Sequence, residues 1–171
     1  MPTVTLAASH HLSRLWEVIL ALHIFSAVIG FGIVFAYPLF MTVGARLDAT
    51  AMPWFHQMQQ AVSRRLVSPA LVLVVVFGVA LASKLSVWGA FYVQWGIGAA
   101  IVIGALEGMV MIPRTGRLAE LARRDVGDRV HSRGTLGPEY HAVQRQVLAV
   151  AGLISGLVLA TVVLMALHVG G

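Results

Sequence analysis

A single histidine stands inside a long apolar stretch of the chain. Residues 22–38 are apolar apart from His23 and a few small or hydroxyl side chains, and the run from Trp16 to Tyr37 adds only Glu17 as an acidic or basic group. His23 follows Trp16 by about seven residues, which at ~1.5 Å of rise per residue places it roughly 10 Å along a helix. An ionisable group at that depth in a bilayer is costly, so His23 is the first candidate for a functional residue.

Other polar side chains are expected near the same end of the predicted helices as His23. They come from all four helices and are Arg14, Glu17, His23, Lys84, Tyr92, Gln94 and His168. The five remaining histidines, His10, His11, His56, His131 and His141, lie in polar surroundings and are predicted to be exposed. The first set is therefore the candidate site, with Glu17, Lys84 and Gln94 as possible supporting residues.

Glu107 stands apart from this set. It lies about one turn from the opposite end of the third apolar segment, close in sequence to Arg114 and Arg117. A buried carboxylate seeks a cation, so the sequence predicts structural pairing with one of these arginines. A proton-carrying role for Glu107 is the alternative.

Three kinds of chemistry are open to His23. A neutral imidazole can bind haem iron in an apolar slot, with Gly30, Gly98 or Gly152 making room for the porphyrin and basic groups at the rim meeting the propionates. It can also bind copper or zinc, but the sequence offers no second ligand at the same depth. Finally, it can form a hydrogen bond to a neighbouring helix.

His168 is the second candidate cofactor-binding residue. It is the only other histidine predicted on the same side of the membrane, but it closes the fourth segment at the surface, roughly 10 Å from the level of His23. A haem b with His23 as its single protein ligand is therefore favoured over a bis-histidine arrangement.

Composition identifies a membrane protein. The 171 residues are 58% hydrophobic and 11% charged, and the mean hydropathy is +0.85, whereas soluble domains carry about 25% charged residues. The absence of cysteine excludes disulfides, thiolate metal sites and a cysteine nucleophile. The N-terminal residues lack the pattern of a cleaved signal peptide, so the first helix is expected to stay attached.

The apolar segments predict a single transmembrane domain over residues 1–171, an all-α, up-down bundle of four helices. The predicted spans are about 16–40, 68–86, 91–112 and 147–168. Pro38 is expected to bend or close the first helix. Residues 44–67 hold apolar side chains at helical spacing, which favours a short helix on the membrane surface.

Two small-residue motifs occur in the third and fourth predicted spans. Gly104 and Gly108, and likewise Gly152 and Gly156, are separated by three residues. This spacing lets helix backbones approach closely. Tight packing inside the bundle is the main prediction, and a dimer face or a slot for a flat ligand is the alternative.

The basic residues predict the orientation in the membrane. Ten of them lie in the first and third connections, and only Arg14 and Lys84 lie on the other side. The ten are Arg46, Arg64, Arg65, Arg114, Arg117, Arg123, Arg124, Arg129, Arg133 and Arg145. The positive-inside rule then places both termini outside the cytoplasm. Because the arginines flank spans and alternate with acids, topology explains the sequence pI of about 10.8, and no nucleic-acid partner is expected.

The chain also carries a family resemblance. Leu22-His23 with Tyr37-Pro38, the stretch from Met58 to Pro69, and Phe77-Gly78 are similar to the first half of the membrane protoporphyrinogen oxidase of bacterial haem synthesis and to the copper-resistance D membrane domain. The stretch from Met111 to Leu118 resembles a family of predicted bacterial integral membrane proteins of unknown function with the same layout.

This resemblance implies a bacterial cytoplasmic membrane protein with His23 as the haem-binding position and Pro69 and Gly78 as scaffold. It does not imply oxidase catalysis, because Leu39, Phe40 and Met41 stand where the oxidase family has basic and histidine residues.

Two functions from different classes remain open. The chain is predicted to bind haem b for electron transfer or porphyrin handling, with the lipid bilayer as its surroundings. Alternatively, it is a non-catalytic accessory subunit that packs in a homodimer or in a larger membrane complex.

Overall fold

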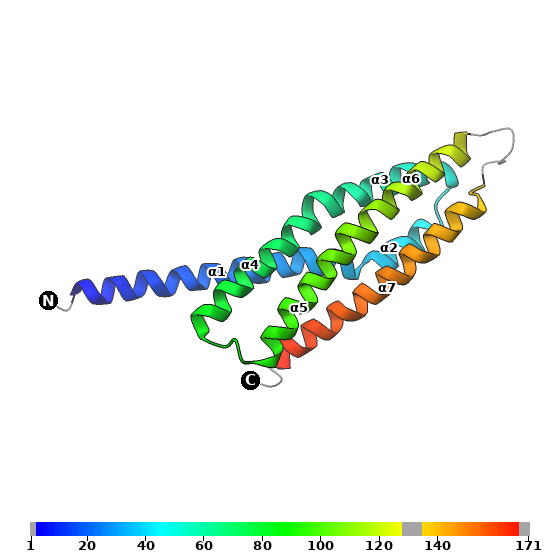
Figure 1. The fold of residues 1–171 in the computed structure, drawn as a ribbon. Helices are drawn as coiled ribbons and strands as arrows, with labels where there is room; N and C mark the ends of the chain where they lie inside the picture. Colours follow the sequence, from blue (N-terminus) through cyan, green and yellow to red (C-terminus); the bar gives the residue numbers. More distant parts are fainter. Residues whose placement is uncertain (1–2, 128–134, 168–171) are drawn as a thin grey trace.

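A computed structural model describes residues 3–127 and 135–167, with side chains from residue 14 onward, and the described parts are helical with short connections (Figure 1). The elements are α1 (Thr3–Phe35), α2 (Tyr37–Gly44), η1 (Ala49–Ala51), α3 (Met52–Val62), η2 (Ser63–Val67), α4 (Ser68–Leu85), α5 (Phe91–Leu106), η3 (Glu107–Met111), α6 (Ile112–Gly127) and α7 (Pro138–Leu167). Two of these, η2 and η3, are single turns of π-helix.

Several elements continue one another and form four helices long and apolar enough to cross a membrane. These are Arg14–Gly44, Ala49–Leu85, Phe91–Gly127 and Pro138–Leu167. They lie side by side in an elongated bundle, from which the N-terminal part of α1 projects (Figure 1). The prediction of an all-helical chain with four apolar segments is confirmed to this extent.

The first long helix is interrupted where its proline lies. Helix α1 ends at Phe35, and α2 begins at Tyr37 with Pro38 in its first turn. Because proline lacks an N–H group and fixes its own φ, it is tolerated at a helix start but not in a helix interior. The prediction that Pro38 bends or closes the first helix is thus confirmed as a break between α1 and α2.

The prediction of a surface helix within residues 44–67 is wrong. Helix α3 continues through η2 into α4 and packs along α6 as part of the bundle. Its buried side chains are Met52, His56 and Gln59, whereas Trp54 is 66% exposed. The mostly polar stripe of this helix therefore faces the bundle, and part of its apolar stripe faces outward.

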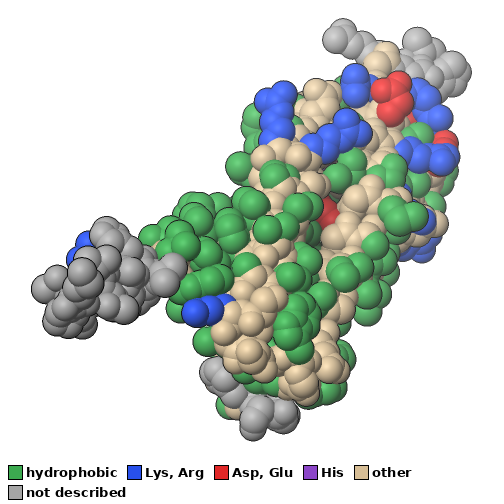
Figure 2. All heavy atoms as spheres, turned by 60° about the vertical axis from the view of Figure 1, so that its left-hand side comes forward, with side chains coloured by type: hydrophobic (Ala, Val, Ile, Leu, Met, Phe, Trp, Pro, Cys, Tyr) green, Lys and Arg blue, Asp and Glu red, His purple; other side chains and the backbone are tan. Residues whose placement is uncertain are grey.

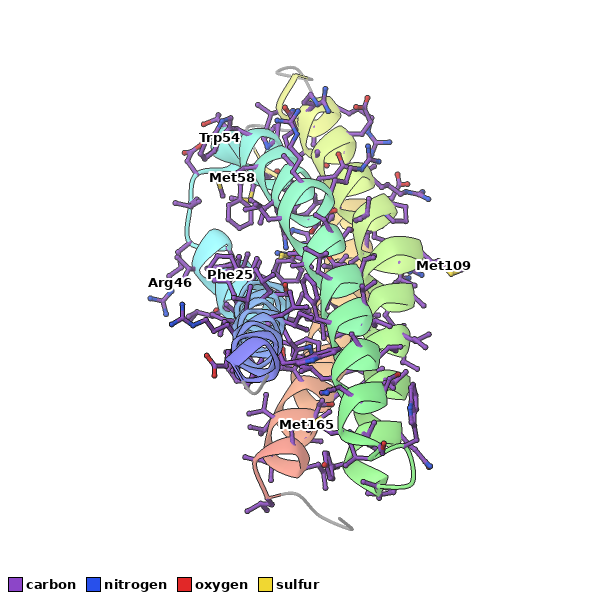
Figure 3. The ribbon with its side chains drawn as sticks, turned by 90° about the vertical axis from the view of Figure 1, so that its left-hand side faces the viewer. Phe25, Arg46, Trp54, Met58, Met109 and Met165 are labelled. Atoms are coloured by element: carbon purple, nitrogen blue, oxygen red, sulfur yellow. The ribbon has the colours of Figure 1, made fainter. Side chains whose placement is uncertain are left out.

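The bundle has an apolar core and an apolar exterior. Its fully buried side chains include Val34, Val67, Ile103, Met111, Val147 and Ile154. Large apolar side chains also cover the outside, and Met109 points away from the bundle (Figure 3). Arginine and lysine side chains gather mainly at one end (Figure 2). Such a surface matches a bilayer, because lipid is as apolar as the protein interior.

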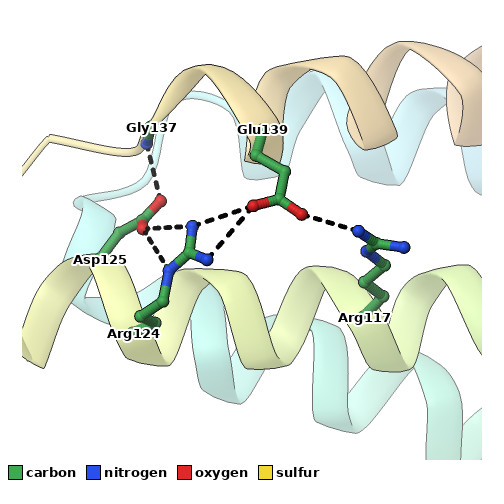
Figure 4. A network of polar contacts seen from close by, with 5 residues as sticks. All are labelled: Arg117, Arg124, Asp125, Gly137 and Glu139. Atoms are coloured by element: carbon green, nitrogen blue, oxygen red, sulfur yellow. Dashed lines mark hydrogen bonds and ion pairs between the residues drawn. The ribbon is translucent and has the colours of Figure 1, made fainter.

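A network of charges joins α6 to α7 at the arginine-rich end (Figure 4). Glu139 accepts a hydrogen bond from Arg117 at 2.7 Å and contacts Arg124 at 3.2 Å. Asp125 is buried and accepts from the backbone N–H of Gly137 at 2.7 Å. Exposed ion pairs contribute little to stability, so their main effect is to fix how the two helix ends meet.

Near the same end, the Asp48 carboxylate accepts hydrogen bonds from the backbone N–H and the hydroxyl of Thr50. These bonds lower the pKa of Asp48 and cap the start of η1.

The glycine motifs do not pack as predicted. A Cβ added at Gly104, Gly108, Gly152 or Gly156 would meet nothing within 4 Å. The tight contacts involve other glycines instead. A Cβ at Gly44 would lie 2.8 Å from the Phe55 ring. The prediction of tight packing inside the bundle is therefore wrong for both motifs, and the alternatives, a dimer face or a slot for a flat ligand, remain predictions.

Candidate functional site

His23 is held by the backbone of the neighbouring long helix. Its Nδ1 lies 3.0 Å from the carbonyl oxygen of Val74 in α4. Because a carbonyl can only accept, Nδ1 carries the proton, and a neutral ring then has an unprotonated Nε2. In the part of the chain with described side chains, no hydrogen bond to Nε2 is found. The predicted hydrogen bond from His23 to a neighbouring helix is thus present.

Gly78 makes this contact possible. It lies one helical turn beyond Val74, where a side chain would stand beside the carbonyl that His23 reaches. A Cβ at position 78 would come within 3.2 Å of His23 Cε1, which is tighter than ordinary van der Waals contact. Gly78 therefore keeps the approach to the Val74 carbonyl open.

His23 also lines a large apolar cavity. The cavity has a volume of about 930 Å³ and is bounded by α1, α4, α5 and α7. Its polar lining residues include His23, Tyr92 and Thr161, and most of the others are aliphatic or aromatic. Gly32, Gly78 and Gly96 also lie on its walls. Ligand sites typically have volumes of 300–1,000 Å³ with few polar groups, so this cavity is the candidate binding site.

The glycines predicted to make room in this site are not the ones that do. A Cβ at Gly30 would lie 3.1 Å from the Leu71 side chain, so Gly30 serves the contact between α1 and α4. Gly98 and Gly152 are exposed and have open space around them. The sequence could not show which glycines line the cavity, because a glycine in an apolar segment gives no sign of whether it is buried.

The predicted set of polar residues comes together only in part. Besides His23, only Tyr92 lines the cavity. Gln94 donates to the Trp88 carbonyl at 3.0 Å, and Lys84 lies 5.4 Å from the centre of the Trp16 ring. Arg14 and Glu17 are exposed. His168 lies outside the described residues.

Glu107 does not pair with an arginine as predicted. It is completely buried, and its Oε1 accepts a hydrogen bond from the Tyr37 hydroxyl at 3.1 Å. The Tyr37 hydroxyl also contacts the Ser63 hydroxyl. Arg117 binds Glu139, and Arg114 donates to Gln146 of α7. The arginines of α6 face α7 and solvent, which leaves Glu107 with hydroxyl neighbours.

Sequence reasoning also missed His56, which is buried rather than exposed. Its Nε2 lies 2.7 Å from the Tyr140 hydroxyl, and its Nδ1 lies 3.4 Å from Gln59 Oε1. One signal was available, because Met52, His56, Gln59 and Ser63 recur at the spacing of one helix face. His141, in contrast, is exposed as predicted.

A metal centre finds no support within the described side chains, where no three His, Asp or Glu groups lie close enough to hold an ion. Comparison with known proteins returns no matching family model, no matching characterised protein and no matching solved structure. The family resemblance predicted from the sequence therefore stays a prediction. The cavity and the buried polar residues are the features on which a functional proposal can rest.

Proposed function

We propose that the chain is a four-span membrane protein that binds haem b in the cavity beside α1, with His23 as the ligand. The observation that carries this proposal is the hydrogen bond from His23 Nδ1 to the Val74 carbonyl. Histidines that bind metals almost always donate their other ring N–H to a carbonyl, a carboxylate or water, which fixes the tautomer and the ring orientation. His23 has this arrangement with its second nitrogen uncommitted.

The cavity fits a flat apolar group. Its walls are predominantly apolar, and its volume of about 930 Å³ lies in the upper part of the range of ligand sites. Gly32 lines it with open space beside its backbone, whereas the space beside Gly78 and Gly96 is taken by the side chains of His23 and Met165. Lys84 and Arg14, on neighbouring helices at the same end of the bundle, are the cations available to the propionates.

The residues of this chain would have distinct tasks at such a site. His23 would bind the iron, the Val74 carbonyl would orient the imidazole, and the surrounding aliphatic side chains would exclude water. When bound, haem supplies one-electron chemistry whose potential depends on the axial ligand and the polarity of its surroundings. Electron transfer or porphyrin handling is therefore the activity proposed for this protein.

The proposed setting is the cytoplasmic membrane of a bacterium, crossed in up-down order by the four long helices. Their apolar exteriors and the arginines at one end support this placement. Because basic residues are retained on the cytoplasmic side, the arginine-rich end lies in the cytoplasm and both termini lie outside.

The test is an absorption spectrum of the purified protein expressed with haem supplied. We expect a Soret band in the wild type and in His141→Ala, whose histidine is exposed, and loss of the band in His23→Ala. Insertion should be retained, because alanine lowers the cost of burying position 23 in a bilayer. A colourless wild type, or an unchanged band in His23→Ala, would contradict the proposal. His168→Ala belongs in the same series, since loss of the band there would indicate a bis-histidine site.

The second candidate is an accessory subunit of a homodimer or a larger membrane complex. It is favoured by the outward-facing glycine motifs, since Gly104 and Gly108 leave open space on one helix and Gly152 and Gly156 on another. Small residues allow close approach between membrane helices. A preparation without haem, together with a defined oligomer that dissociates in Gly108→Leu, would favour this function.

A further inference from the structure

Glu107 lies at one end of a short chain of hydrogen-bonded hydroxyl groups in the bundle interior. The Tyr37 hydroxyl donates to Glu107 Oε1 at 3.1 Å and also contacts the Ser63 hydroxyl. A phenol has a single proton to donate, so while Tyr37 donates to Glu107 it accepts from Ser63. With Glu107 ionised, the hydrogen bonds therefore run from Ser63 through Tyr37 to the carboxylate, and they reverse when a proton passes along these hydroxyl groups to the carboxyl group.

No cation compensates this carboxyl group within the part of the chain that the structure describes. Arg64 and Arg65 of η2 are exposed, and the arginines of α6 bind α7 or lie in solvent. Glu107 Oε2 is buried and has no hydrogen-bond partner there. An ionised carboxylate is very costly in such a place, whereas a neutral carboxylic acid is not. The geometry therefore favours a protonated Glu107.

The backbone is irregular at the same two places. The π-turn η2 begins at Ser63, and the π-turn η3 begins at Glu107. Each turn inserts an extra residue, so that Ser68 N–H bonds to Ser63 O and Ile112 N–H bonds to Glu107 O. Single π-turns inside α-helices occur frequently at functional sites. The positions of Ser63 and Glu107 therefore depend on π-turns, which regular α-helices lack.

A second group of polar residues leads from Ser63 toward the arginine-rich end. Gln59 lies one turn before Ser63 on the same helix face, and its Oε1 contacts His56. His56 in turn contacts the Tyr140 hydroxyl at 2.7 Å. Tyr140 lines a surface pocket of about 300 Å³ together with Leu47 and Gln144.

Gln59 Nε2 is also buried without a hydrogen-bond partner among the described residues. Internal water commonly satisfies such atoms, and water at this level would join the two groups.

We propose that Glu107 reversibly binds a proton, and that Tyr140, His56, Ser63 and Tyr37 form the route between this carboxyl group and the pocket at the arginine-rich end, with Gln59 holding the water that joins His56 to Ser63. In the loading step, the water beside Gln59 gives a proton to Ser63 and regains one from the side of His56, Ser63 gives its own proton to Tyr37, and Tyr37 gives its own to the Glu107 carboxylate. Each hydroxyl ends with one proton, and the carboxyl group gains one. This site is separate from the His23 cavity and does not depend on haem binding.

Infrared spectroscopy of the full chain in lipid nanodiscs tests the proton site. We expect a carbonyl stretch of a protonated carboxylic acid that shifts in D₂O and is lost in Glu107→Gln. Tyr37→Phe should keep the band but change its frequency, because one hydrogen bond to the carboxyl group is removed. If Glu107→Gln does not fold, this second variant still decides the assignment. A wild type without such a band, or a band unchanged in both variants, would overturn the proposal.

The route is tested by the rate at which this band responds to a jump from H₂O to D₂O. We expect Tyr140→Phe to slow the response by about tenfold, which corresponds to about 1.4 kcal/mol of added barrier. Tyr92→Phe is the matched control, because Tyr92 lines the other cavity. Equal rates in the wild type and in Tyr140→Phe would show that protons reach Glu107 by another way.

Discussion

At the scale of single residues, Gly78 is the position on which the His23 geometry depends most. A Cβ there would lie 3.2 Å from the imidazole, so Gly78→Ala should push the ring away from the Val74 carbonyl. Changes in groups that orient a metal ligand typically cost 10- to 100-fold in affinity, and we expect a loss of about this size in haem titrations. Gly98→Ala, in open space, is the control and should titrate like the wild type.

Residue types predicted some of this site and missed the rest. His23 was identified because a lone imidazole in an apolar span is rare and costly. The partners of Glu107 were missed because Tyr37 is 70 positions away, and nearness in sequence suggested the arginines instead. His56 was judged from its polar neighbours, although the periodic stripe that buries it was present in the sequence.

At the scale of elements, we expect the substitution of glycine by alanine to have opposite effects at two positions on the long helices. At Gly44 the new methyl group would lie 2.8 Å from the Phe55 ring, and overpacking of this kind costs about 1–3 kcal/mol. At Gly104 it would meet nothing within 4 Å, and alanine is favoured over glycine in a helix by about 1 kcal/mol.

Thermal unfolding in a single detergent should therefore give a lower midpoint for Gly44→Ala than for the wild type, and an equal or higher one for Gly104→Ala. A lower midpoint for Gly104→Ala would mean that a neighbouring chain packs against this face.

Element boundaries followed from the sequence wherever a local signal set them. Pro38 lies in the first turn of α2, just after the break that ends α1, and Gly127 and Pro138 bound the connection between α6 and α7. The continuity of α3 with α4 was missed, because residues 52–67 are more polar than a span and the periodicity of Trp54, Met58 and Leu66 indicated a membrane surface. That side of the helix is indeed exposed, but the opposite side packs along α6, which no local pattern reveals.

At the scale of the whole molecule, the arginine distribution predicts the orientation. A reporter fused at position 134 should behave as cytoplasmic, and one fused after position 171 should behave as external, because basic loops resist translocation. A phosphatase that is active only outside the cytoplasm and a fluorescent protein that matures only inside it provide complementary measurements. If the two fusions give the reverse pattern, both the orientation and the placement of the His23 cavity toward the outer face are wrong.

The second and third long helices are longer than a bilayer is thick. Ala49–Leu85 and Phe91–Gly127 each contain 37 residues, or about 55 Å of helix, against about 30 Å of hydrocarbon. In the proposed membrane placement, each would therefore extend beyond the bilayer as a stiff helix that contains one π-turn. A one-residue migration of the π-turn at Ser63 would rotate the turns it passes by about 100° and carry the serine away from Tyr37. A twist of the protruding helix ends would therefore change the hydrogen bonds that link Ser63, Tyr37 and Glu107.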